Sequence, residues 1–133
     1  MEVGDSYTIS FSFTQEQVAQ FAEVTGDDNP IHLDADFAAN TPFKKPIIHG
    51  FLGGSIFSKV LGPLFPGKGS IYIRQSMEFL RPMFVEQEYR ADFKIVSINR
   101  EKHRAVISTE VFDATTNKIT IKGEAEMMNS EKL

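Results

Sequence analysis

Residues 49–62, HGFLGGSIFSKVLG, place the strongest constraint on the fold, because they form a helical stretch that is apolar on almost every side. Within Gly50–Leu61 the large apolar side chains are Phe51, Leu52, Ile56, Phe57, Val60 and Leu61. A helix of this kind is buried on most of its surface. Gly53 and Gly54 each cost it about 1 kcal/mol of stability relative to Ala. Their expected compensation is close approach of the helix to a neighbouring backbone or to a ligand.

The chain after this helix has the pattern of a β-sheet. Strands are predicted at Ser70–Leu80, Glu88–Ile98, Arg104–Phe112 and Ile119–Met128. The short turns NREKH and DATTNK separate the last three of these strands. A meander of long antiparallel strands around the buried helix is the economical packing. We therefore predict an α+β fold, with a sheet edge free to pair with a second subunit.

The segment before the helix predicts one more strand and two shorter helices. Apolar and polar residues alternate over residues 7–13, as in a half-buried strand. Thr14 and Gln17 have the spacing of a capping box at a helix start, and Gly26 can end that helix in a left-handed conformation. Asp34 can cap a second helix over residues 35–39.

The composition limits the possible classes of protein. A length of 133 residues without linkers or repeats predicts a single domain over residues 1–133. The net charge of -4 and pI of about 5.3 disfavour binding to nucleic acid or to an anionic membrane. There is no Cys, so disulfides and thiolate catalysis are excluded. No apolar run approaches the roughly 18 residues of a membrane span, and no secretion signal is visible. We expect a cytoplasmic protein.

The stretch TGDDNPIHLDADF, Thr25–Phe37, holds the candidate site. Pro30 fixes its own backbone and restricts Asn29 to an extended conformation. A sharp turn there can direct Asp27 and His32 toward one point. A carboxylate and an imidazole can hold a water molecule between them and move its protons near neutral pH. The amide of Asn29 can orient the same water.

Two other readings of this stretch stay open. Asp27 and Asn29 can simply form a turn with solvated charges. His32, Asp34 and Asp36 can suggest a metal site, but carboxylates at alternating positions are more often helix caps and surface charges. We therefore expect no metal.

Gly50 gives an independent indication of chemistry. It lies at the start of the buried helix, where backbone N–H groups lack intrahelical partners and the helix dipole is positive. Such an N–H can stabilise an oxyanion. Alternatively, Gly50 only allows a tight turn into the helix, and His49 is a structural residue that bonds a loop carbonyl.

These motifs together resemble the MaoC-like hydratases, in particular their single-domain (R)-specific enoyl-CoA hydratases. The first matching block is Phe21-x-x-Val24-Thr25-Gly26-Asp27-x-Asn29-Pro30-Ile31-His32, followed after five residues by Ala38. Later blocks are HGF at 49–51 and RQSMEFLRP at 74–82. The likeness is dense from about residue 21 to residue 82 and continues in strand order.

The resemblance implies a hot-dog fold, in which an antiparallel sheet wraps a central helix, and a homodimer whose sheets join. It implies reversible syn addition of water to a trans-2-enoyl-CoA, giving the (3R)-3-hydroxyacyl thioester. Asp27 and His32 then form the catalytic pair, Asn29 orients the site and Gly50 supplies the oxyanion N–H. No metal or redox cofactor is needed, and acyl-CoA or an acylated carrier protein is the partner.

Substrate-binding positions are predicted on the helix and in the later block. Phe57, Ser58 and Leu61 can line an acyl tunnel or belong to the core, and Gln75 lies within a matching block. Arg74 departs from the small or neutral residue usual before that Gln, and can point into the tunnel or outward. The turn FVEQEY also departs, since it lacks a residue suited to positive φ.

Three rival functions use the same fold. A hot-dog thioesterase can also carry His-Gly at the helix start, a 3-hydroxyacyl-carrier-protein dehydratase runs the same reaction backward, and a binding module needs no acid/base pair. The intact loop from Asp27 to His32 favours hydration over hydrolysis or mere binding.

Overall fold

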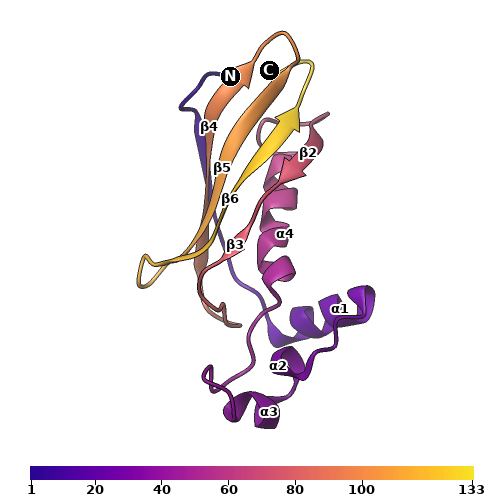
Figure 1. Cartoon of the computed structure of the whole chain (residues 1–133), viewed down its shortest axis with the longest axis vertical. Coiled ribbons are helices and arrows are strands. Elements are labelled where there is room, and N and C mark those ends of the chain that lie inside the picture. Colours follow the sequence, from indigo (N-terminus) through magenta and orange to yellow (C-terminus); the bar gives the residue numbers. More distant parts are fainter.

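Helix α4, Gly50–Leu61, lies against one face of a six-stranded antiparallel sheet in the computed structural model, which describes residues 1–133 (Figure 1). Seven of its twelve residues are buried: Leu52, Gly53, Gly54, Ile56, Phe57, Val60 and Leu61. The ring of Phe57 packs edge-on against Phe93 of the sheet, with centroids 5.8 Å apart. The α+β prediction and the burial of this helix are both confirmed.

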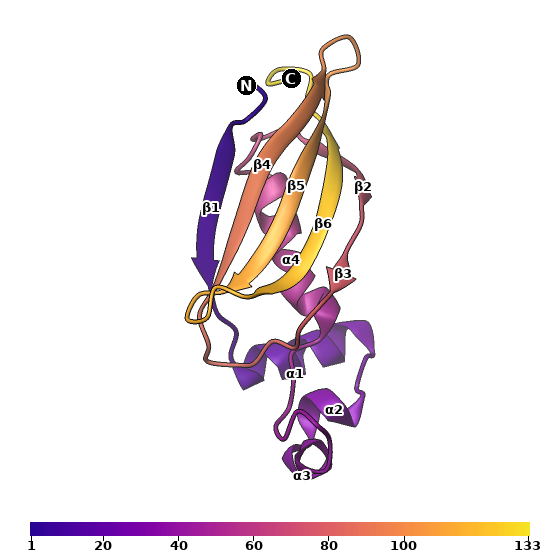
Figure 2. The ribbon, with the colours of Figure 1, turned by 60° about the vertical axis from the view of Figure 1, so that its left-hand side comes forward.

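The sheet follows the order β1-β4-β5-β6-β2, and β3 also pairs with β6. The strands are β1 Ser6–Phe11, β2 Ile71–Gln75, β3 Glu78–Phe79, β4 Tyr89–Asn99, β5 Arg104–Asp113 and β6 Ile119–Met128. Strands β4, β5 and β6 form the predicted meander. Figure 2 shows β1 at one edge of the sheet and β2 with β3 at the other.

The predicted strand Ser70–Leu80 is wrong in its continuity, because it is divided into β2 and β3 by Ser76 and Met77. The backbone of Ser76 crosses close to Gly123 of β6, where an added Cβ would lie 1.8 Å from the Ser76 carbonyl oxygen. The Ser76 N–H donates to the Glu124 carbonyl at 2.9 Å, and the Glu124 N–H donates to Ser76 Oγ at 3.0 Å. This exchange keeps the chain on the sheet edge through the break.

The two helical glycines allow two methionines to reach α4. An added Cβ at Gly53 would lie 3.0 Å from Met83 Sδ, and one at Gly54 would lie 2.5 Å from Met77 Sδ. The close approach is therefore to side chains of the segment that includes β3, and not to the backbone or the ligand that was predicted. The same segment is tied to the entry of α4, because the Ile48 N–H donates to the Met83 carbonyl at 2.8 Å.

Three short helices extend beyond one end of the sheet (Figure 1): α1 Gln15–Thr25, α2 Pro30–Leu33 and α3 Ala35–Ala39. The capping box of Thr14 and Gln17 is present, and Gly26 ends α1 with φ 80°. Asp34 caps α3, because its side chain accepts hydrogen bonds from the N–H groups of Asp36 and Phe37. Helix α2 was not predicted; Pro30 occupies its first turn and the Asn29 side chain caps it.

The turn before β4 adopts the positive φ that its residues do not favour. Glu86 has φ 59°, which is uncommon for a residue other than Gly. Its N–H donates to the Phe13 carbonyl at 2.8 Å, and nearby the Phe84 N–H donates to Tyr89 Oη at 2.7 Å. These bonds hold the turn against the strand ends.

No helix combines the length and the apolar character required to cross a bilayer.

The close contact at Gly123 gives a stability prediction. In a Gly123→Ala variant the new methyl group would overlap backbone atoms of Ser76 and Met77, so the edge segment must move. We expect a loss of at least about 2 kcal/mol in the free energy of unfolding, measured by urea denaturation. Lys122→Ala, on the exposed side of the same strand, should change it by less than about 0.5 kcal/mol. Equal stability of the two variants would contradict this packing.

Candidate active site

A pocket of about 470 Å³ opens where the start of α4 meets α2 and β3. Eight of its thirteen lining residues are hydrophobic, so its wall suits an apolar ligand. The polar or reactive positions along it are His32, His49, Gly50 and Arg81. Two of the predicted catalytic positions, His32 and Gly50, thus share one pocket.

His32 lies on α2 with its ring orientation fixed by one hydrogen bond. Its Nδ1 is 2.8 Å from the Ile47 carbonyl oxygen. A carbonyl can only accept, so Nδ1 carries the proton and Nε2 keeps its lone pair. The residue is 9 % exposed. His32 is therefore set up to accept a proton through Nε2.

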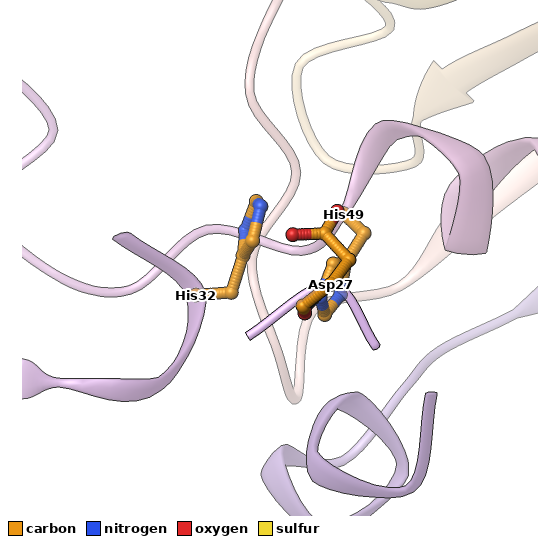
Figure 3. A group of neighbouring side chains, drawn as sticks. All are labelled: Asp27, His32 and His49. Atoms are coloured by element: carbon orange, nitrogen blue, oxygen red, sulfur yellow. Dashed lines mark hydrogen bonds between the residues drawn. The ribbon is translucent and has the colours of Figure 1, made fainter. Parts of the chain in front are cut away.

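Asp27 lies directly after the left-handed Gly26, and its side chain is exposed. One oxygen of its carboxylate, one ring nitrogen of His32 and one of His49 all lie within 4.8 Å of one another. Figure 3 shows the carboxylate directed toward the His32 ring. A water molecule about 2.8 Å from each of two groups fits a separation of up to roughly 5.6 Å. The geometry thus accommodates a water between Asp27 and His32.

The side chain of Asn29 caps helix α2. Its side-chain oxygen accepts from the Ile31 N–H at 3.4 Å, at the start of α2. Its own N–H donates to Asp27 Oδ1 at 3.4 Å. Asn29 therefore links the Asp27 carboxylate to the helix that carries His32, and its role as an orienting residue remains a prediction.

Gly50 begins α4, and the ring of Phe79 lies against it. An added Cβ would meet Phe79 Cε1 at 2.8 Å. The absence of a side chain at Gly50 therefore lets the Phe79 ring lie directly against the helix start. The N–H groups of a helix's first turn lack intrahelical acceptors, which leaves the Gly50 N–H suited to bind an oxyanion.

His49 was not predicted to belong to the site, and its ring lies at the centre of it. It is 2 % exposed, and its Nε2 is 2.9 Å from the Asp27 carbonyl oxygen. This matches the alternative that His49 bonds a loop carbonyl. Its ring stacks on His32, with centroids 3.9 Å apart and planes 30° apart. Because nitrogen lone pairs lie in the ring planes, this stack disfavours a metal ion shared by the two rings.

The predicted substrate-binding residues lie outside the pocket. Phe57 and Leu61 are fully buried in the core, whereas Ser58 is exposed on α4. The Gln75 amide donates to Thr109 Oγ1 at 2.9 Å within the sheet. Their roles remain predictions.

Arg74 points away from the pocket. It forms an ion pair with Glu126 at 3.9 Å, and its side chain is 67 % exposed. Glu126 alternates along β6 with the buried Ala125 and Met127, so this pair lies on the outer face of the sheet. The outward orientation is therefore the observed one. The sequence reasoning missed Phe79, Arg81 and Met83 as pocket residues, although RQSMEFLRP, residues 74–82, contains the first two and Met83 follows it directly.

Known proteins agree with this architecture. The family model described as "MaoC like domain" matches residues 2–118. The chain is 42 % identical to an (R)-specific enoyl-CoA hydratase of Aeromonas caviae, over 94 % of this chain and 92 % of that protein. It is 34 % identical to a 3-hydroxybutyryl-CoA dehydratase of Methylorubrum extorquens, over 94 % of this chain and 78 % of that protein.

Solved structures give the same result. The (R)-hydratase of A. caviae superposes with a TM-score of 0.92 at 41 % identity, covering 96 % of each chain. An R-hydratase of Pseudomonas aeruginosa superposes with a TM-score of 0.92 at 36 % identity, covering 98 % of this chain and 83 % of that one. The sheet around α4 is thus a hot-dog fold, and the chain belongs to the MaoC-like domain family.

Proposed function

We propose that this protein catalyses the reversible, (R)-specific hydration of trans-2-enoyl-CoA to (3R)-3-hydroxyacyl-CoA. One observation carries the proposal: the Asp27 carboxylate and the His32 imidazole lie within 4.8 Å of each other beside an apolar pocket. Gly50 at the start of α4 lines that pocket. The names of the hydratase relatives support the same substrate class.

The reaction divides between these three residues. Asp27 and His32 hold a water, and His32 Nε2 takes one of its protons as the oxygen bonds to C3 of the enoyl group. The electrons of the C2–C3 double bond move toward the thioester, and the Gly50 N–H stabilises the negative charge on its oxygen. The proton then returns from the same pair to C2. The net change is addition of one water, and neither a metal nor a redox cofactor takes part.

The protein acts as a cytoplasmic homodimer in this proposal. The edge strand β2 supports dimerisation, because it exposes three large apolar side chains: Ile71 at 52 %, Tyr72 at 36 % and Ile73 at 40 %. An unpaired strand edge is a template for pairing with another chain. A second copy paired there would extend the sheet and cover these residues.

The exposed face of α4 supports a path for the acyl chain. Phe51 lines the pocket, and Ser55 and Ser58 follow it at the spacing that places residues on one helix face. All three are exposed, whereas Phe57 and Leu61 face the core. An acyl chain that starts at Gly50 and runs along this face reaches Ser58 after two turns of the helix.

The first test of the function is the absorbance of crotonyl-CoA, which falls when water adds to the enoyl group. We expect turnover by the wild type and losses of about 100-fold or more in Asp27→Asn and His32→Gln, as for lost acid/base catalysis. Asp28→Asn, one residue away on the same exposed segment, should retain activity. Full rates in the first two variants would contradict the mechanism.

Two further assays distinguish the rival functions. Release of free thiol from saturated acyl-CoA would indicate a thioesterase. Turnover restricted to carrier-bound substrates would indicate a 3-hydroxyacyl-carrier-protein dehydratase.

Chain-length selection gives a second test. Ser58→Phe should leave crotonyl-CoA turnover intact and lower kcat/KM for longer enoyl-CoA substrates, because the new ring fills the predicted path. Kinetics on a series of increasing acyl length measure this. Lys59→Phe, an exposed neighbour on a different face of α4, should leave the profile unchanged. If Ser58→Phe also leaves it unchanged, the acyl chain takes another route.

A further inference from the structure

The buried ring of His49 is the feature that the proposed mechanism does not use. Its Nδ1 is buried and has no hydrogen-bond partner. Buried polar atoms normally have partners, so an orphaned one beside a reaction site requires an explanation. The ring touches both members of the proposed catalytic pair through two different contacts.

The first contact fixes the main chain of Asp27. Because the Asp27 carbonyl can only accept, the 2.9 Å bond requires the proton of His49 on Nε2. The orphaned Nδ1 is then a bare lone pair and not a buried N–H without an acceptor. The bond spans 22 residues of sequence and links the Asp27 segment to the start of α4. The other bonds of this segment are local: the Asp27 N–H donates to Thr25 Oγ1 and the Asp28 N–H to the Gly26 carbonyl.

The second contact fixes the ring of His32. His49 lies between two rings, with Phe21 of α1 at 4.8 Å and His32 of α2 at 3.9 Å between centroids. The charged or titratable groups that face His49 are Asp27 and His32 themselves. A neutral His49 also avoids a second positive charge stacked on His32 when that residue accepts the proton of water. The stack and the single bond to Ile47 together determine where His32 Nε2 points.

We propose that His49 is a positioning residue, which holds the Asp27 carboxylate and the His32 imidazole at the separation that water activation needs. This inference rests on the proposed function. His49 is also the residue immediately before Gly50. Because the two residues are adjacent, His49 also fixes the position of Asp27 and His32 relative to the Gly50 N–H that is proposed to bind the oxyanion.

Two substitutions separate its contacts. His49→Phe keeps a flat ring between Phe21 and His32 but removes the N–H donor, whereas His49→Gln keeps a donor of similar reach and removes the ring. We expect His49→Phe to lower kcat on crotonyl-CoA by about 10-fold or more, because misplaced groups lose orientation, with KM unchanged within about twofold. His49→Gln should restore part of kcat. A folded His49→Phe enzyme with wild-type kcat would overturn the proposal.

A double variant distinguishes positioning from a general structural effect. If His49 acts through Asp27, Asp27→Asn/His49→Phe should be no slower than Asp27→Asn alone, because residues that act as a unit are not additive. Losses that multiply would show that His49 does not act through Asp27.

Nuclear magnetic resonance tests the same inference without turnover, so that it stays separate from the proposed function. The ¹⁵N signals of the wild-type imidazoles should show His49 protonated on Nε2. The amide signal of Asp28, which follows the bonded carbonyl, should move in His49→Phe and stay near its place in His49→Gln. A His49 protonated on Nδ1 in the wild type would overturn the proposal, even if neither variant folds.

Discussion

The burial of α4 is the constraint on which the rest of the structure depends. The large apolar side chains of this helix have to be buried, and the twisted sheet covers seven of its twelve residues while Phe51, Ser55 and Ser58 stay exposed. Gly53 and Gly54 let Met83 and Met77 approach the helix, which draws the segment around β3 toward its first turns. Met83 and Phe79 of this segment line the pocket at the helix start. Met83 therefore contributes both to the core and to the pocket.

One part of the site belongs to the buried helix, and the other part is held in place by a few hydrogen bonds. Gly50 belongs to the buried helix, and its position is set by the core. Asp27 lies on the loop between α1 and α2, and His32 lies on the short helix α2. Both are outside the sheet, where little core packing is available. Single hydrogen bonds and the ring stack supply the missing order: His32 to Ile47, and His49 to Asp27. His49 thus connects the start of α4 to the segments that carry Asp27 and His32.

The sequence predicted features governed by local rules and missed those that depend on contacts across the fold. Caps and apolar periodicity identified α1, α3, α4 and the meander, because these signals act within a few residues. The break between β2 and β3 depends on Gly123, 47 residues after Ser76, and no local pattern marks it. The proposed catalytic pair and the proposed role of Gly50 came from motif and resemblance together. The central place of His49 was missed because the sequence alone gave its ring no neighbours.

The stereochemistry of water addition tests the central claim most directly. In the proposed mechanism Asp27 and His32, which lie in one cluster, both deliver the water and return the proton, so both steps occur on the same side of the substrate. The test is hydration of crotonyl-CoA in deuterium oxide, followed by proton resonance analysis of the 3-hydroxybutyryl product. The account predicts a (3R) hydroxyl with deuterium added at C2 to the same face. A (3S) product, or deuterium on the opposite face, would contradict it.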